Sequence, residues 1–261
     1  DMIRSLFIAK TGMDSSQFKL DTISNNLANV STNGFKRQRA VFEDLMYQVL
    51  RQPGSQTSST TNHPTGLQVG TGAAPVGVDR LFAQGNLTRT ENNLDMAING
   101  KGFFRVQLPD GTTGYTRDGA FKLNEQGQVV NSSGYLLDPQ ITVPANATGI
   151  SISRTGSVEV TLPGQAQPTN LGNIQISSFI NPQGLESIGG NLFLETAASG
   201  APTDGDPGSD GLGQVSQGYI EASNVNVTEE LVNLITAQRA YEINSRAVKT
   251  SDEMLQRLTQ L

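Results

Sequence analysis

Cysteine and tryptophan are both absent from this 261-residue chain, and histidine occurs only once. Without cysteine the chain has no thiolate ligand for zinc and no cysteine nucleophile, although the same absence leaves the redox compartment undecided. The single histidine, His63, lies in a polar stretch before Pro64, with no nucleophile and orienting acid near it in sequence. A histidine in such a setting is more often inert than catalytic.

Long apolar runs and basic stripes are missing as well. No run approaches the roughly 20 apolar residues of a membrane span, and charges interrupt residues 2–30 too often for the apolar centre of a cleavable signal peptide. The formal net charge is −6, and the middle of the chain is acidic. We therefore expect neither stable membrane insertion nor nucleic-acid binding.

Motifs for cofactors and metals are incomplete. The glycines at 70–72 and 100–102 lack the third glycine of a dinucleotide fingerprint. Asp204, Asp206 and Asp210 superficially resemble a calcium loop, but the glycine and the final glutamate do not fall at the required positions. No carboxylate pair stands out for acid–base catalysis. The sequence thus predicts no catalytic residue, no cofactor, no metal and no enzyme.

What the chain does have is a heptad pattern at its beginning. Alternating steps of four and three from Met2 give a row in which only Ser16 is polar, which predicts a helix. The helix should end near Asn29, because residues 31–34 have turn chemistry. A helix over 1–30 extends roughly 40 Å, so its apolar seam needs a partner. The seam residues are Met2, Leu6, Ala9, Met13, Leu20, Ile23, Leu27 and Val30.

A second heptad pattern ends the chain. Its apolar row recurs every seven residues at Val227, Leu234, Tyr241, Val248 and Leu255. A mostly polar companion row, which restricts register and partner number, is predicted at Leu231, Gln238, Ser245 and Asp252. Asn226 and Glu229 form a plausible capping pair at the start of this helix. Long amphipathic helices therefore occupy both ends.

The residues between the helices divide into three parts. Residues 31–76 form a connection in which 41–51 fits either a helix or a strand, and 52–72 is a polar segment, either a linker or an arm ordered against other subunits. Short apolar runs between turns predict an antiparallel β-rich domain over 77–213. Residues 214–261 are expected to hold a connection and the last helix. The expected strands are 94–98, 103–108, 120–123, 135–137, 150–152, 158–162, 174–180 and 192–194. The predicted class is α+β, with the helices in a coiled-coil-like inner layer.

Basic residues cluster immediately after the first turn, at Lys36, Arg37 and Arg39. The simpler interpretation is a solvated face, since surface charges contribute little. The alternative is a contact with acidic groups of a neighbouring subunit.

Long motifs at both ends resemble the flagellar rod and hook family. The first is NNLANVSTNGFKR at 25–37, and the second is GYIEASNVNV at 218–227, continued by AQRAYE at 237–242. Between them, AINGKGFF at 97–104 and YTRDG at 115–119 resemble the β domain of that family. The signature residues are Asn25, Asn26, Asn29, Asn33, Gly34, Phe35, Asn224, Asn226, Arg239 and Tyr241.

The resemblance implies a structural subunit of the bacterial flagellar basal body. Copies would stack helically around a channel into a rigid hollow drive shaft that carries torque to the hook, and residues 51–72 resemble the arm of the distal-rod members. Implied partners are further copies of the chain, proximal rod proteins, the hook protein, the P and L rings and the export apparatus. The implied location spans the periplasm, reached without a cleaved signal peptide. The alternatives are a proximal-rod or hook-like subunit, or a secreted β-rich enzyme or adhesin that trimerises through its helices.

Overall fold

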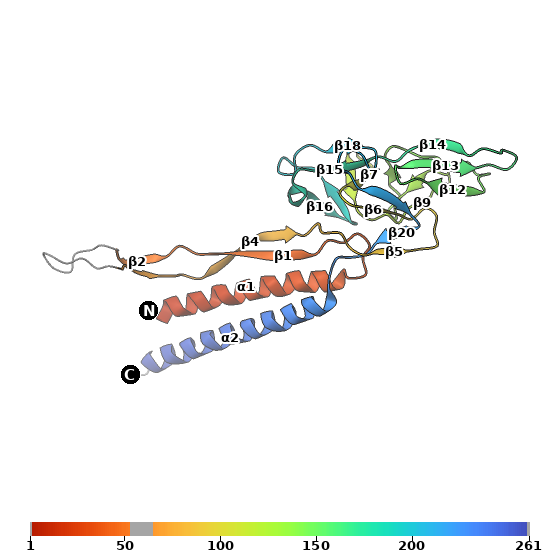
Figure 1. Ribbon diagram of the computed structural model, residues 1–261. Helices are drawn as coiled ribbons and strands as arrows, with labels where there is room; N and C mark the ends of the chain where they lie inside the picture. The colour runs from red at the N-terminus through yellow and green to blue at the C-terminus, as the bar shows by residue number, and fades with distance from the viewer. Residues whose placement is uncertain (1, 53–64, 260–261) are drawn as a thin grey trace. The chain divides into compact units, whose positions relative to one another are not determined.

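A computed structural model of the protein describes residues 2–52 and 65–259 (Figure 1). The chain divides into two compact units. The helical unit comprises the described parts of 1–27, 38–79 and 226–261, and the β unit comprises 28–37 and 80–225. His63 and most of the polar segment predicted over 52–72 lie outside the described residues.

Two long helices and two strand pairs build the helical unit. Helices α1 (Met2–Ala28) and α2 (Val227–Thr259) lie side by side, with the N-terminus of one and the C-terminus of the other at the same end (Figure 1). Strand β1 (Gln38–Asp44) pairs with β4 (Ala73–Arg80), and β2 (Gln48–Arg51) pairs with β3 (Leu67–Val69). The sequence pattern fits either a helix or a strand over residues 41–51. Strands β1 and β2 show that this segment is mainly extended.

Local signals set the ends of both helices. The N-terminal helix ends at Ala28, one residue before the predicted Asn29, and Thr32 N–H then bonds the Asn29 carbonyl in a turn. At the start of α2, the Asn226 side-chain oxygen accepts the N–H groups of Thr228 at 3.0 Å and Glu229 at 3.3 Å. These bonds satisfy two donors that the first helical turn leaves unpaired, and they confirm the predicted N-cap.

Packing within the helical unit depends on a small residue and an aromatic pair. A Cβ added to Gly12 of α1 would lie 2.8 Å from the Asn244 side-chain nitrogen of α2, so the helices approach closely there. Phe18 of α1 meets Phe42 of β1 edge-to-face, with ring centroids 6.3 Å apart. The strand pair β1–β4 is therefore packed on the first helix.

Antiparallel strands make up the β unit. Its main sheet follows the order β16-β17-β8-β7-β11-β10-β9, with β15 also beside β7 and β18 beside β15. A separate sheet has the order β12-β13-β14, and two further pairs are β19–β6 and β20–β5. The bounds are β5 (Leu87–Arg89), β6 (Met96–Asn99), β7 (Phe103–Gln107), β8 (Thr113–Thr116), β9 (Lys122–Leu123), β10 (Val129–Val130), β11 (Leu136–Leu137), β12 (Gly149–Ile152), β13 (Ser157–Thr161), β14 (Thr169–Asn173), β15 (Ile176–Ser178), the 3₁₀ turn η1 (Pro182–Gly184), β16 (Glu186–Gly189), β17 (Leu192–Leu194), β18 (Thr203–Gly205), β19 (Gln214–Gln217) and β20 (Tyr219–Glu221).

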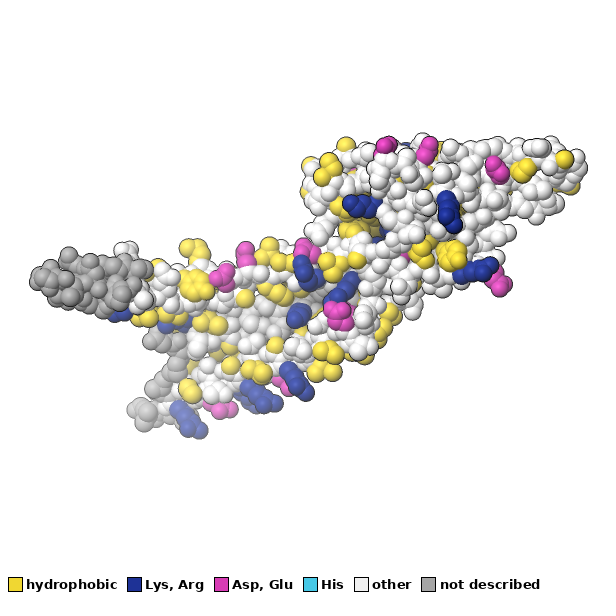
Figure 2. Space-filling model, viewed as in Figure 1, with side chains coloured by type: hydrophobic (Ala, Val, Ile, Leu, Met, Phe, Trp, Pro, Cys, Tyr) yellow, Lys and Arg dark blue, Asp and Glu magenta, His cyan; other side chains and the backbone are white. Residues whose placement is uncertain are grey.

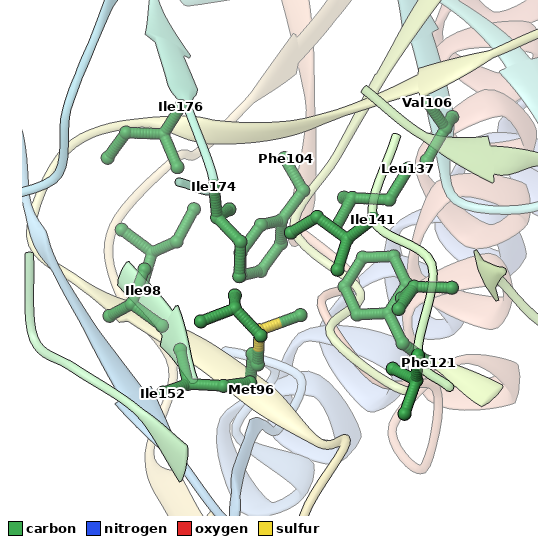
Figure 3. Packing of buried hydrophobic residues seen from close by; sticks show 14 of the residues in the cluster. Met96, Ile98, Phe104, Val106, Phe121, Leu137, Ile141, Ile152, Ile174 and Ile176 are labelled. Atoms are coloured by element: carbon green, nitrogen blue, oxygen red, sulfur yellow. The ribbon is translucent and has the colours of Figure 1, made fainter. Parts of the chain in front are cut away.

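The β unit contains a large apolar core and a second, smaller aromatic-rich cluster around Phe103 and Phe193. Side chains far apart in sequence, among them Met96, Phe104, Phe121 and Ile174, converge in the large core (Figure 3). Phe104 and Phe121 pack edge-to-face with ring centroids 5.3 Å apart. The large core takes side chains from 96 to 215 and so connects strands across most of the β unit.

The α+β class is confirmed, and each expected strand overlaps an observed one. The compact units differ from the predicted ranges, because the β unit also includes 28–37 and 214–225. Strand β19 pairs with β6 and β20 pairs with β5, which joins 214–221 to the β unit. Neither helix is long and apolar enough to cross a membrane over the residues that are described.

Candidate assembly surface and buried ion cluster

Side chains from three of the sequence motifs meet in a buried ion cluster of the β unit, formed by Lys36, Arg117 and Glu221. Lys36 Nζ lies 2.5 Å from Glu221 Oε1, and Arg117 Nε donates to Glu221 Oε2 at 2.7 Å. The side chains are 1%, 5% and 0% exposed for Lys36, Arg117 and Glu221. The ion cluster thus ties the beginning and the end of the β unit to its middle.

Backbone groups complete the ion cluster. Lys36 Nζ also donates to the Ala83 carbonyl at 2.8 Å, and the Gly85 N–H donates to Glu221 Oε1 at 2.8 Å. Arg117 Nη1 donates to the carbonyls of Gly100 at 2.9 Å and Gly102 at 2.6 Å, and both glycines belong to the motif at 97–104. Buried charges are tolerated when their donors and acceptors are paired in this way.

Two buried cations share one carboxylate. Burial lowers the pKa of Lys36 below the ordinary 10.5, the Glu221 carboxylate opposes that shift, and the Arg117 cation adds to it. Glu221 therefore favours the charged form of Lys36 in a medium that disfavours charge.

The expectation that Lys36 belongs to a solvated face is wrong. Its ammonium reaches an acid of the same chain, because residues 34–37 run beside 221–224 in the β unit. Arg39, in the helical unit, is different, since its guanidinium is 62% exposed and pairs with Asp79 at 3.0 Å.

Signature residues Gly34 and Asn224 hold the same two segments together. Gly34 has φ +68° and donates its N–H to the Glu221 carbonyl at 2.7 Å. Asn224 accepts the Arg37 N–H at 2.6 Å and donates to the carbonyls of Leu81 at 2.8 Å and Ala83 at 2.9 Å. The geometry shows why an amide, with a donor and an acceptor, suits position 224.

A second polar cluster joins three elements of the helical unit around Asn26. Its side-chain oxygen accepts the Gln38 N–H at 2.8 Å, and its nitrogen donates to the Gln38 carbonyl at 2.8 Å and to Glu230 Oε2 at 3.0 Å. Asn26 and Glu230 are each 1% exposed. Helix α1, strand β1 and helix α2 therefore meet at one amide, while Asn25 beside it bonds the Gln38 side chain at 3.0 Å.

The other signature residues have less distinct surroundings. Asn29 accepts the Thr32 hydroxyl at 3.1 Å, and Phe35 accepts the Asn224 N–H on its carbonyl at 3.4 Å. Asn33 is half-buried, and Arg239 is exposed on α2.

The predicted seam of α1 is partly covered within the helical unit. Ala9 and Ile23 are buried, whereas the other described seam side chains, Leu6, Met13, Leu20 and Leu27, are half-buried. Val30 lies in the turn after the helix, and the side chain of Met2 is outside the description. The role of these residues in assembly stays a prediction.

On α2 the apolar row and the companion row differ in burial within a single copy. Leu234, Tyr241, Val248 and Leu255 are half-buried, but Leu231, Gln238, Ser245 and Asp252 are exposed. Two side chains that lie three residues after an apolar position meet α1: Asn244 lies beside Gly12, and Glu230 accepts a hydrogen bond from Asn26. The role of the companion row between copies stays a prediction.

Apolar side chains remain exposed on both helices. Val227, Leu231 and Ile235 follow one another at steps of four and are 43%, 45% and 49% exposed. Val232, Ile243 and Met254 follow at steps of eleven and are 58%, 66% and 52% exposed. On α1, Ile3 is 75% and Phe7 is 51% exposed. Together these eight residues form what we call the exposed apolar surface of the helical unit, and Figure 2 shows hydrophobic side chains at the surface along this unit.

Acidic residues and a cavity of the β unit are the remaining candidates for chemistry. No group of three or more His, Cys, Asp or Glu residues that could hold a metal occurs within 2–52 and 65–259. Asp204, from the superficial calcium pattern, instead pairs with Arg105 Nη1 at 3.1 Å. A cavity of about 730 Å³ borders Phe82, Phe103 and Lys101, and two of its charged side chains, Lys36 and Arg117, already bond Glu221.

Tyr115 gives a titration signal for the folded β unit. Burial raises its pKa from the ordinary 10.0 to about 12, helped by the Glu195 and Asp204 carboxylates. Between pH 10 and about 12 the folded state therefore keeps a proton that the unfolded state has released, so the free energy of unfolding falls as pH rises through this range. We expect the tyrosinate absorbance of the native chain minus that of Tyr115→Phe to titrate near pH 12; a midpoint near 10 would contradict this environment.

Comparisons with known proteins cover both ends and the middle of the chain. Residues 6–36 match the family described as flagella basal body rod protein, residues 97–160 the flagellar hook protein FlgE/F/G D1 domain, and residues 216–261 the C-terminal part of flagellar basal body rod FlgEFG proteins. The chain is 57% identical over 260 residues to the flagellar basal-body rod protein FlgG of Buchnera aphidicola subsp. Schizaphis graminum, with 100% of both chains covered. Identity to the FlgG proteins of Caulobacter vibrioides and Bacillus subtilis is 53% and 38%, with at least 99% of each chain covered.

Proposed function

The chain belongs to the FlgG family of flagellar basal-body rod proteins and is a structural rod subunit, and we propose that copies of it assemble helically into the rigid, hollow distal part of the rod. In this proposal the terminal helices form an inner, coiled-coil-like layer around a channel. The β unit lies outside that layer. The assembled shaft transmits torque from the motor to the hook, and no step in this role requires catalysis or a cofactor.

The observation that carries the proposal is the exposed apolar surface. A helix whose apolar residues point in more than one direction is normally buried on more than one side. In α2 one side meets α1, yet Val232 and Ile243 lie on another and stay more than half exposed. Burying one large aliphatic side chain contributes about 1.5 to 3 kcal/mol, so packing of neighbouring copies is the straightforward way to stabilise this surface.

The remaining parts of the proposal follow from family membership. The segment predicted over 52–72 would act as an extended polar arm that stiffens the shaft. The proximal rod proteins and the hook protein would be its neighbours along the axis, the P and L rings would surround it, and the export apparatus would deliver it without a cleaved signal peptide. The predicted ranges remain our proposal: 1–30 for the inner helix, 31–76 for the connecting region with its arm, 77–213 for the outer domain, and 214–261 for a connection and the second inner helix.

Substitution of Ile243 tests assembly directly. With Ile243→Glu, each copy places a charge where an aliphatic side chain would be buried, so we expect the critical concentration for tube formation to rise roughly 10- to 100-fold. Sedimentation and negative-stain micrographs of the purified chain measure it. The matched control is Ile180→Glu, the same exchange at a side chain that is 91% exposed on the β unit.

The control should assemble nearly as the unsubstituted chain does. If Ile243→Glu also formed tubes at the unsubstituted concentration, packing of the terminal helices between copies would be ruled out.

A further inference from the structure

Helix α1 is covered on two sides within the helical unit. Gly12 lies close to Asn244 of α2, and Phe18 packs on Phe42 of β1. A helix that is apolar in more than two directions needs a further neighbour. The remaining side of α1 is therefore where another chain can pack.

Four exposed side chains mark this third side of α1. They follow one another at steps of four, seven and seven residues, and such steps keep them on one side of a helix. Ile3 and Phe7 are 75% and 51% exposed, and Asp14 and Asp21 are exposed after them. We call these four residues the acidic row, which is apolar near the N-terminus and anionic beyond it.

A matching row lies on α2. Arg239 and Arg246 are exposed and are also seven residues apart. Because Arg246 follows Asn244 by two residues, and Asn244 meets α1, Arg246 points away from α1 of the same copy. Ile243 and Met254, on the same side of the helix, are 66% and 52% exposed. We call Arg239, Ile243, Arg246 and Met254 the basic row.

The equal spacing lets both charge pairs form at once. In an antiparallel alignment Asp14 meets Arg246 and Asp21 meets Arg239, and in a parallel alignment the partners are exchanged. Charges that flank the seam between two helices determine partner choice and orientation. The charges alone therefore allow two alignments, which differ in direction.

Helix direction and the apolar residues favour the antiparallel alignment. Helices α1 and α2 of one copy run antiparallel (Figure 1). Copies related by rotation about a common axis and a shift along it keep the direction of every helix that lies along that axis, so α1 of one copy is antiparallel to α2 of the next. Phe7, seven residues before Asp14, then lies seven residues after Arg246, beside Met254. A thioether against an aromatic ring is a favourable contact.

We propose that the acidic row of one copy docks on the basic row of the next copy in antiparallel fashion, with Asp14 on Arg246, Asp21 on Arg239 and Phe7 on Met254. The rows are two different patches of the same chain, and such heterologous contacts generate helical assemblies when the rotation does not close. This inference rests on the proposed helical assembly and identifies the partner of part of the exposed apolar surface.

Charge exchange tests the contact and its direction. Asp14→Arg and Arg246→Asp each place like charges together, and we expect each to raise the critical concentration for tube formation roughly 5-fold at low salt, less at high salt. The combined variant Asp14→Arg/Arg246→Asp restores an opposite pair and should return the critical concentration toward the unsubstituted value.

The matched control is Asp14→Arg/Arg239→Asp, which has the same net charge as that combined variant. It leaves both antiparallel pairs with like charges, so its critical concentration should rise roughly 25-fold if the two effects add. The parallel alignment makes the opposite prediction, because there Asp14 and Arg239 are partners and this control would be the rescued variant.

Cross-linking gives a second readout, because the chain contains no cysteine of its own. Copies with Phe7→Cys mixed with copies with Met254→Cys should give a disulfide-linked dimer in assembled tubes. Copies with Phe7→Cys mixed with copies with Val232→Cys should not, because Phe7 reaches Val232 only in the parallel alignment.

Two results would overturn this contact and leave the proposed assembly intact. One is tube formation that neither single charge reversal affects, and the other is rescue by Asp14→Arg/Arg239→Asp in place of Asp14→Arg/Arg246→Asp. Failure of the unsubstituted chain to form tubes would overturn both the contact and the proposed assembly.

Discussion

Replacing Glu221 with glutamine is expected to lower the free energy of unfolding by about 3 to 5 kcal/mol, the usual range for removing one partner of a buried ion pair. The amide can accept one hydrogen bond but turns a donor toward either Lys36 Nζ or Arg117 Nε. Both cations then remain in a site where they are at most 5% exposed. Thermal unfolding should move down by roughly 10 °C in a unit of this size.

The pH dependence of that loss has a definite sign. Without Glu221, the group that raises the pKa of Lys36 is gone, so the folded-state pKa falls further below the 10.5 of free lysine. Between the two values the unfolded state binds more protons, and the free energy of unfolding of Glu221→Gln should therefore rise with pH up to about 10.5. Urea unfolding at several pH values measures this.

Asp79→Asn is the matched control, because it removes an acid whose partner Arg39 is 62% exposed. Such surface pairs contribute about 1 kcal/mol or less. Equal losses for Glu221→Gln and Asp79→Asn would show that the ion cluster does not stabilise the β unit.

Replacing Gly34 with alanine is expected to destabilise the β unit by about 3 kcal/mol, from backbone strain together with overpacking. Gly34 adopts φ +68°, a conformation that alanine rarely takes. A Cβ there would also lie 2.7 Å from the Arg117 carbonyl carbon and the Asp118 nitrogen, which are backbone atoms that cannot swing away. Because Arg117 belongs to the ion cluster, its contact with Glu221 should weaken as well.

Gly134→Ala separates the two contributions. Gly134 has φ +86°, and a Cβ there would meet nothing within 4 Å, so only the strain of about 1 kcal/mol applies. Denaturant unfolding of both variants gives the comparison. A Gly34→Ala variant no less stable than Gly134→Ala would mean that the backbone at 117–118 moves aside without penalty.

Both helices were predictable from the sequence, because their signals are local. Heptad spacing marks the interior of α1 and α2, turn residues mark the end at Ala28, and Asn226 marks the start at Val227. Eight strands were also predicted, since apolar runs between turns identify buried strands. Exposed edge strands such as β16 were missed because they have no such pattern.

Much of the ion cluster lay within the recognised motifs, yet its members were not identified as partners. Glu221 is the one charged residue in GYIEASNVNV, and an isolated acid among small and apolar residues was the available signal. Lys36 was misread because it stands beside Arg37 and Arg39, and a basic triplet suggests a solvated surface. Its burial depends on segments that the sequence alone does not place beside it.

The sequence by itself determined the two terminal helices, the α+β class, the lack of cysteine chemistry and the family, because periodicity, composition and long motifs are properties of the linear chain. The tertiary structure alone decided that Asn244 faces α1, and that Lys36 meets Glu221 across 185 positions. The physical reason is that a charged side chain is buried only where the fold brings an oppositely charged partner beside it. The position of that partner depends on the packing of every strand between them.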